Sequence, residues 1–125
     1  MNNYNIAVIP GDGIGIEVVD SALKVLDKVS NNNNFKLNYS FYDWGSNYYF
    51  KNKLMMPEDG LDLLSKSDAI FLGAIGHPDI QDHLTLNGLL LPIRRKFDQY
   101  VCIRPSVLFP GCLLYTSDAA DDDRS

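Results

Sequence analysis

A short apolar run, a cluster of glycines and an amphipathic segment follow one another at the N-terminus and constrain the fold more than any other feature. Residues 4–10 are rich in Ile and Val and lead into Gly11-Asp12-Gly13-Ile14-Gly15, which predicts a buried strand that enters a tight turn. From residue 16 to 29, apolar side chains recur at steps of three and four, which predicts a helix with one buried face. The residues of that face are Ile16, Val19, Ala22, Leu23, Leu26 and Val29.

The same alternation continues along the chain. Residues 35–42 place apolar side chains at every second position, the period of a strand with one buried face. Pro57-Glu58-Asp59 predicts a helix start, and that helix is expected to reach Lys66. Residues 68–74 form a second buried strand that closes in glycines. Alternating strands and helices predict an α/β fold with a largely parallel sheet flanked by helices, in which ligands bind at the carboxyl ends of the strands.

The pattern predicts two further elements before residue 111. A helix is expected over residues 90–100, with Ile93, Phe97, Tyr100 and Val101 on its buried side. Residues 101–107 are expected to form a strand in which Cys102 and Arg104 share one face. Cys102 is interpreted as a small hydrophobic residue that stays a thiol in a reducing compartment.

Composition limits the classes of protein to which the chain can belong. Its 125 residues are 46% hydrophobic and 22% charged, which fits one globular domain. The formal net charge is -5, and residues 117–125 hold four of the sixteen acidic residues, so the rest of the chain is nearly neutral. This balance argues against nucleic acid and membrane surfaces as partners. The sequence lacks a membrane-spanning run and a signal peptide, so we expect a cytoplasmic protein.

The last fourteen residues have no periodicity and no relation to what precedes them. Back-translation of Cys112-Leu113-Leu114-Tyr115-Thr116-Ser117-Asp118-Ala119-Ala120-Asp121-Asp122 resembles a transposase adapter from sequencing libraries, read as coding sequence. We therefore expect residues 112–125 to be an adapter-derived tail, to be excluded from functional reasoning. Residues 1–111 would then be the natural N-terminal part of an incomplete domain.

The glycine cluster leaves two interpretations open. Backbone amides at a helix N-terminus bind phosphate well, so a dinucleotide site is one of them. However, Gly11, Gly13 and Gly15 have the spacing G-x-G-x-G, whereas the Rossmann fingerprint is G-x-G-x-x-G. A plain tight turn is the other interpretation, and the spacing favours it.

Two arginines are the best candidates for substrate binding. The planar guanidinium donates two parallel hydrogen bonds to a carboxylate and keeps its charge, so Arg94 and Arg104 could each hold a carboxylate. The alternatives are an exposed ion pair of Arg94 with Asp98 and a simple strand-end cation at Arg104. Arg95 is expected to face solvent. His77 and His83 lack a metal-ligand pattern and are interpreted as loop residues.

Several motifs together resemble those of a known family. Pro10-Gly11-Asp12-Gly13-Ile14-Gly15 is similar to the opening of the β-decarboxylating dehydrogenases, the family of isocitrate, isopropylmalate and tartrate or D-malate dehydrogenases. The resemblance is strongest to the tartrate/D-malate branch and covers about residues 5–111. The strings that carry it are Phe41-Tyr42-Asp43-Trp44, Met55-Met56-Pro57-Glu58-Asp59-Gly60, Gly88-Leu89-Leu90-Leu91-Pro92-Ile93-Arg94-Arg95 and Arg104-Pro105.

The resemblance implies an activity and a set of site residues. The intact enzyme would oxidise a (2R)-hydroxy dicarboxylic acid such as D-malate or tartrate with NAD and Mg²⁺ or Mn²⁺, with decarboxylation where the substrate allows it. Arg94 and Arg104 match the substrate arginines, and Ile14, Gly76, Thr85 and Asn87 match positions beside the cofactor. The family's metal-binding aspartates, lysine and tyrosine would lie beyond Gly111, so this fragment would hold no catalytic and no metal-binding residue. It is therefore expected to be inactive and to fold poorly alone, and the full-length protein to be a homodimer.

Two positions depart from the tartrate/D-malate pattern. Asn87 stands where tryptophan is usual, and Cys102 where asparagine is usual. Two alternatives therefore remain, a 3-isopropylmalate dehydrogenase of the same family and a non-catalytic α/β binding module.

Overall fold

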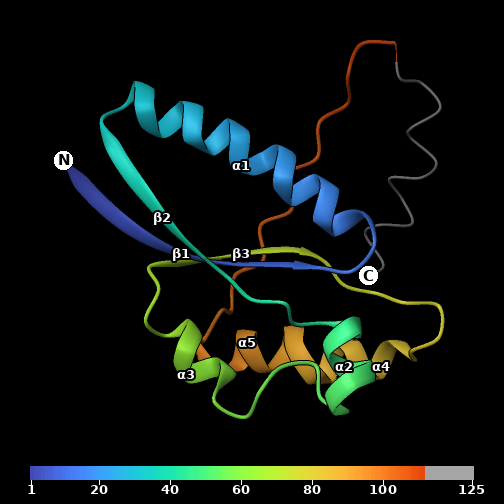
Figure 1. Cartoon of the computed structure of the whole chain (residues 1–125). Helices are drawn as coiled ribbons and strands as arrows, with labels where there is room; N and C mark the ends of the chain where they lie inside the picture. The colour runs from blue at the N-terminus through green and yellow to red at the C-terminus, as the bar shows by residue number, and fades with distance from the viewer. Residues whose placement is uncertain (112–125) are drawn as a thin grey trace.

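Three parallel strands form the centre of the protein. In the computed structural model, residues 1–111 are described, and their sheet has the strand order β2-β1-β3 (Figure 1). The strands are β1 (Asn2–Gly11), β2 (Phe35–Phe41) and β3 (Ala69–Ala74), and both pairings with β1 are parallel. The predicted α/β fold with a parallel sheet flanked by helices is thereby confirmed.

Helices cover both faces of this sheet. The long helix α1 (Ile14–Asn32) lies on one face, and the shorter helices lie on the other (Figure 1). These are α2 (Ser46–Asn52), α3 (Gly60–Leu64), α4 (Asp82–Thr85) and α5 (Leu91–Lys96). A π-helical turn, η1 (Leu86–Leu90), joins α4 to α5, so residues 82–96 form one continuous helical segment.

The central strand divides the core into two layers. Ala7 and Ile9 point toward the short helices, where they pack in a cluster with Trp44, Met55, Leu64, Ile80, Leu89 and Ile93. Val8 points to the opposite face because side chains alternate along a strand. It is fully buried there, on the face that α1 covers. Because β1 is buried on both faces, its sequence contains a continuous apolar run, as is usual for the central strands of parallel sheets.

The N-terminal predictions are confirmed, with local corrections. All three predicted strands are present, and α1 covers the predicted helix. Ile16 and Val29 were placed on its buried face but are exposed, because only Gly15, Val19 and Ser30 of this helix are fully buried. The helix expected over residues 57–66 is shorter and spans Gly60–Leu64.

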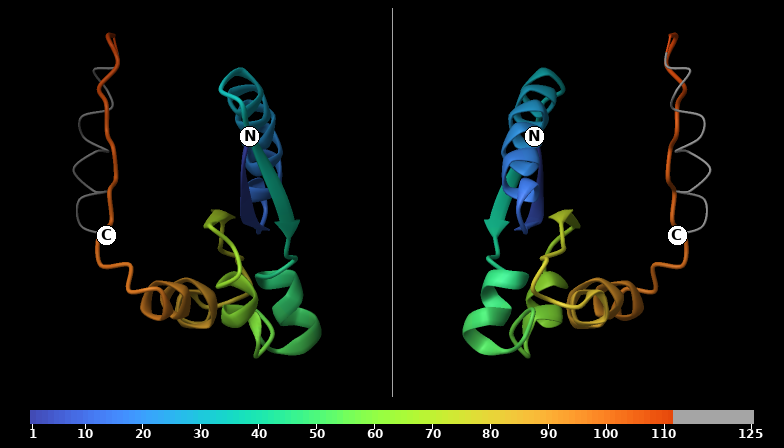
Figure 2. Two further views of the ribbon diagram at one scale, coloured as in Figure 1. Left: turned by 90° about the vertical axis from the view of Figure 1, so that its left-hand side faces the viewer. Right: turned by 90° about the vertical axis from the view of Figure 1, so that its right-hand side faces the viewer.

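The secondary structure predicted for residues 97–107 is wrong. The helix expected to reach Tyr100 ends at Lys96, and the backbone turns at Asp98, whose φ is 49°. Tyr100 is 93% exposed and Val101 is exposed as well, so neither lies on a buried face. Residues 101–107 were expected to form a strand but pair with no strand of the described sheet. They run away from the sheet and helices (Figure 2), and Cys102 is exposed rather than packed in a core.

The prediction for residues 112–125 lies outside the described residues. Within residues 1–111, no helix is both long and apolar enough to cross a membrane.

Candidate functional site

The loops that follow the three strands meet at one edge of the sheet. Their meeting point is Asp12, which follows β1 and is only 8% exposed. Its carboxylate accepts hydrogen bonds from the Ser46 amide at 2.8 Å, the Ser46 hydroxyl at 2.6 Å and the Gly76 amide at 2.9 Å. These three donors offset the cost of burying a carboxylate. Asp12 therefore fixes the loops after β2 and β3 against its own loop.

The glycine loop is built for close packing at this edge. Gly11 and Gly13 have φ values of 79° and 52°, conformations that favour glycine. A Cβ on Gly15 would lie 2.6 Å from the amide nitrogen of Ala74, so the first turn of α1 packs directly on the end of β3. The structure thus shows a tight turn at the glycine loop, in agreement with the interpretation that the spacing favoured.

Two predicted cofactor residues lie next to this cluster. Ile14 is the first residue of α1, and its side chain is exposed. The exposed Gly76 is tied to Asp12 through its amide. The Asp12 hydrogen bonds bring Ile14 and Gly76, which are 62 positions apart in the numbering, to the same edge of the sheet.

The other two predicted cofactor residues lie on the helical segment of residues 82–96. Thr85 is buried, and its hydroxyl donates a hydrogen bond to the Asp82 carbonyl at 2.8 Å, within the same helix. Asn87 is exposed and lines a pocket of about 500 Å³. His83 lines the same pocket, whereas the His77 ring packs edge-on against Phe50 with centroids 5.0 Å apart.

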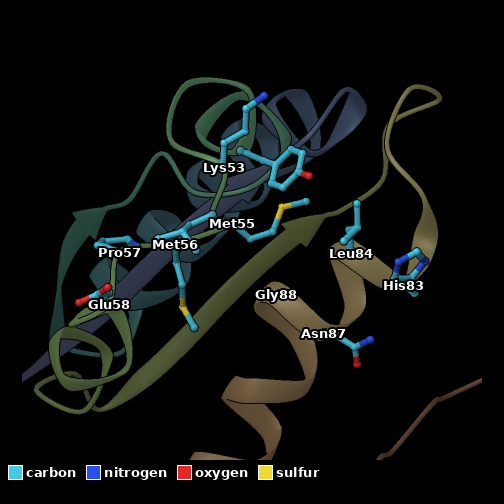
Figure 3. Close-up of a pocket in the computed structure, with 11 residues that line it drawn as sticks. Lys53, Met55, Met56, Pro57, Glu58, His83, Leu84, Asn87 and Gly88 are labelled. Atoms are coloured by element: carbon cyan, nitrogen blue, oxygen red, sulfur yellow. The ribbon is translucent and has the colours of Figure 1, made fainter.

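The pocket beside Asn87 is mostly apolar. One wall comes from residues 53–58, which include Met55 and Met56, and the other comes from His83, Leu84, Asn87 and Gly88 (Figure 3). A Cβ on Gly88 would lie 2.6 Å from Met55 Cγ, so the two walls approach closely there. Lys53, Glu58 and His83 supply polar groups at its rim.

Arg94 lies in the last turn of α5 and is exposed. It lines a shallow depression of about 290 Å³ together with Arg95, Asp98, Gln99 and Tyr100. Two guanidinium groups at one depression make it suited to an anion. Arg95 is exposed, as predicted. Residues 1–111 contain no ion pair between Arg94 and Asp98, because the helix ends before Asp98 and the spacing of a helical pair is lost.

Arg104 lies apart from this depression. It is exposed in the extended segment after α5 and does not line the depression around Arg94. The structure therefore brings Ile14 and Gly76 together at one edge but does not bring the two arginines into one pocket. Within the described residues, no group of three or more acidic, His or Cys side chains is arranged to hold a metal ion.

Sequence reasoning missed the role of Asp12 and Ser46. Asp12 was noted only as part of the glycine string and Ser46 was not singled out, because a hydrogen bond between residues 34 positions apart leaves no local pattern. The available signal was the position of Asp12, an acidic residue between two glycines directly after a buried strand. An acid at such a position needs donors from neighbouring loops.

Comparison with known proteins gives a consistent result. The isocitrate/isopropylmalate dehydrogenase family model matches residues 5–121. A probable tartrate dehydrogenase/decarboxylase of Agrobacterium vitis is 53% identical over 112 residues, which cover 89% of this chain and 31% of that protein. The decarboxylating D-malate dehydrogenase of Escherichia coli K12 is 45% identical over 127 residues, which cover 98% of this chain and 35% of that protein.

A solved structure has a fold similar to that of this chain. The apo form of a β-decarboxylating dehydrogenase from Thermococcus kodakarensis matches with a TM-score of 0.62 and 32% identity, over 78% of this chain and 27% of that one. The chain spans about a third of the length of the curated relatives it matches. Since the family model covers most of the chain, the chain belongs to the isocitrate/isopropylmalate dehydrogenase family.

Proposed function

We propose that this chain supplies substrate-binding arginines and one wall of the cofactor site of an NAD-dependent dehydrogenase acting on D-malate, tartrate or a similar (2R)-hydroxy dicarboxylic acid. The observation that carries the proposal is the exposed Arg94 guanidinium in the cationic depression at the end of α5. The relatives named tartrate and D-malate dehydrogenases support this class of substrate.

The arginines would act by holding carboxylates. A dicarboxylate gripped at both ends has a fixed orientation, and each guanidinium can form two charge-assisted hydrogen bonds. In the proposed site Arg94 binds one carboxylate. Arg104 lies outside the depression around Arg94, so the proposal requires the segment after α5 to bring Arg104 to the same substrate.

The cofactor wall would be the edge of the sheet around Asp12. Ile14 and Gly76 are exposed there, and the Asp12 hydrogen bonds hold the loops that carry them. They would pack against the nicotinamide ring or a ribose of the dinucleotide. NAD would supply the hydride acceptor when bound. Asn87 would offer its side-chain amide to the cofactor from the helical segment of residues 82–96. The hydrogen bond from the buried Thr85 hydroxyl to the Asp82 carbonyl would hold the backbone that carries Asn87.

A divalent metal does not fit the described residues by themselves, because they gather no set of ligands. We therefore assign no step of the reaction to a metal in this chain. In the overall reaction, the carbon that bears the hydroxyl gives up a hydride and the hydroxyl gives up its proton, which produces a ketone. The β-carboxylate then leaves as CO₂, and the electron pair of the broken bond moves toward the new carbonyl. The proton-transfer groups would come from the part of the protein outside this chain.

A hybrid enzyme tests the proposal. In it, residues 1–111 replace the matching part of the E. coli D-malate dehydrogenase, and NAD reduction is followed with D-malate, tartrate and 3-isopropylmalate. We expect activity on D-malate or tartrate, and we expect Arg94→Met to lower kcat/KM by about 100-fold or more. Lys96→Met is the matched control, because Lys96 is an exposed cation of the same helix that does not line the depression, and it should change kcat/KM by less than about fivefold. An Arg94→Met variant that keeps full kcat/KM would refute the proposed role.

One observation favours a second candidate in the same family. Asn87 lies beside the apolar pocket that contains Met55 and Leu84, and such a pocket can take a branched alkyl group. If the hybrid enzyme prefers 3-isopropylmalate to D-malate, isopropylmalate oxidation is the better assignment.

A further inference from the structure

The Asp12 carboxylate is a buried negative charge at the edge of the sheet. Asp12 is 8% exposed, and its hydrogen-bond donors are the Ser46 hydroxyl and the amides of Ser46 and Gly76. All three donors are neutral groups, so they satisfy the carboxylate oxygens without cancelling the charge. The loops that meet at Asp12 therefore share a fixed negative charge as well as a set of hydrogen bonds.

The N-terminus of α1 offsets this charge only in part. The helix begins at Ile14, two residues after Asp12, and the Gly15 amide donates a hydrogen bond to the Asp12 carbonyl at 2.9 Å. The dipole of an α-helix is equivalent to about half a positive charge at its N-terminus. A whole carboxylate charge beside it leaves the edge negative. Such an edge attracts a cation and repels a phosphate, although a helix N-terminus alone would bind a phosphate.

The same edge leaves space for a ligand to approach. A Cβ built on Gly13 or Gly76 would meet no atom of the described residues within 4 Å, apart from its chain neighbours. The Ile14 side chain between these glycines in the chain is exposed as well. Glycines without neighbours allow a ligand to contact the backbone closely. Because the Gly76 amide donates directly to Asp12, a ligand on Gly76 would lie within reach of the carboxylate charge.

We infer that Asp12 is a specificity-determining residue that makes this edge bind NAD⁺ in preference to NADH. This rests on the proposed function, in which the dinucleotide lies against Ile14 and Gly76. The nicotinamide ring is a cation in NAD⁺ and neutral in NADH, so a nearby carboxylate attracts the ring of NAD⁺ alone. The pyrophosphate is negative in both forms and would lie away from Asp12. The charge of Asp12 would thereby strengthen binding of the oxidised cofactor and favour release of the reduced one.

Cofactor binding to the hybrid enzyme tests this inference without a catalytic readout. Isothermal titration calorimetry gives the Kd values of NAD⁺, NADH and ADP-ribose, which lacks the nicotinamide. Asp12→Asn removes the charge and keeps the shape of the side chain. We expect the ratio of the NAD⁺ Kd to the NADH Kd to rise by about fivefold or more, and ADP-ribose to follow NADH. Asp43→Asn is the matched control, because Asp43 is an exposed carboxylate in the adjacent loop, and it should change this ratio by less than about twofold.

A second pair of variants covers the case in which Asp12→Asn does not fold. Ile14 is 67% exposed, so replacing it should not unfold the protein. Ile14→Lys adds a positive charge at the same edge, and we expect it to raise the ratio of the NAD⁺ Kd to the NADH Kd by about threefold or more. Ile14→Met adds an uncharged side chain of similar length and should leave the ratio unchanged.

The alternatives give different results. Equal changes for NAD⁺ and NADH in Asp12→Asn, or in Ile14→Lys, would mean that the edge does not sense the charge of the ring, and this would overturn the inference. Tighter binding of NAD⁺, NADH and ADP-ribose in Asp12→Asn would also overturn it, because the pyrophosphate would then lie at this edge. A hybrid enzyme that binds no dinucleotide would refute the proposed function together with the inference, whereas equal changes in one that binds both forms refute the inference alone.

Discussion

The Ser46 hydroxyl donates a 2.6 Å hydrogen bond to the Asp12 carboxylate from 34 positions further along the chain. With the Ser46 and Gly76 amides, this bond joins the loops that follow all three strands. These are the loops at the edge where ligands of parallel α/β sheets usually bind. The shape of that edge therefore depends on one buried carboxylate.

Replacing Asp12 should destabilise the fold strongly. In the hybrid enzyme, Asp12→Ala leaves three donors without their acceptor, and we expect the free energy of unfolding to fall by about 3 kcal/mol or more. Urea denaturation measures the change. Asp43→Ala is the control, because Asp43 is an exposed carboxylate in the adjacent loop, and it should cost less than about 0.5 kcal/mol. Equal losses for the two variants would contradict the role of Asp12.

A methyl group at Gly15 should not be tolerated. Its Cβ would lie 2.6 Å from the Ala74 amide nitrogen, so α1 would have to move away from β3. We expect Gly15→Ala to lower the free energy of unfolding by about 2 kcal/mol or more, measured by thermal or urea denaturation of the hybrid enzyme. Gly60→Ala provides the comparison, since the atoms nearest to its Cβ belong to the flexible Met56 side chain, and it should be close to neutral. The prediction is wrong if Gly15→Ala is equally neutral.

The hydrogen bond between Tyr39 and Asp27 gives a pH-dependent signal. Partial burial, the hydrogen bond to Asp27 and the negative charge of Asp27 raise the pKa of Tyr39 from 10.0 to about 12. The unfolded chain loses this proton near pH 10, whereas the folded chain keeps it. The contribution of Tyr39 to stability is therefore complete below pH 10 and is lost as the pH rises from 10 to about 12.

Ultraviolet titration of tyrosinate tests this assignment. The difference between the wild type and Tyr39→Phe isolates the titration of Tyr39. Asp27→Asn should lower the pKa of Tyr39 because it removes the negative charge. If the pKa of Tyr39 is the same in the wild type and in Asp27→Asn, Asp27 is not a cause of the shift.

The π-helical turn offers a matched pair of leucines. Leu89 is fully buried in the core between the sheet and the short helices, whereas Leu86, three positions earlier, is 43% exposed. Leu89→Ala should cost about 2–5 kcal/mol because it leaves a cavity, and Leu86→Ala less than about 1 kcal/mol. Urea denaturation of the hybrid enzyme compares them. A larger loss of stability for Leu86→Ala would mean that Leu86, and not Leu89, faces the core.

The sequence predicted the sheet well because its signals are local. β1 and β3 are apolar runs that end in glycines, and β2 alternates apolar and polar residues. A helical period between β1 and β2 implies a parallel crossover. The side of α1 that faces the sheet was less predictable. Ile16 fits the helical period as well as Val19 does, but only tertiary packing decides which of them is buried.

The positions of the candidate site residues in the fold were less predictable for the same reason. Exposure of Arg94 and Arg95 follows from their charge, but the end of α5 depends on the positive φ of Asp98, which the helical period does not reveal. The strand expected over residues 101–107 needs a neighbouring strand to supply its hydrogen bonds. The links from Asp12 to Ser46 and Gly76 span 34 and 64 positions, so no local pattern could encode them.

The π-helical turn at Leu86–Leu90 also sets the rotational phase of everything that follows it. A π turn holds about one residue more than an α turn, so the segment after it is rotated by about 100° relative to an uninterrupted α-helix. Deleting one residue from this turn would therefore rotate Ile93 out of the core and carry the Arg94 guanidinium to a different direction. The direction of the Arg94 guanidinium, which the proposed function assigns to substrate binding, is thus set by the length of a turn that precedes it.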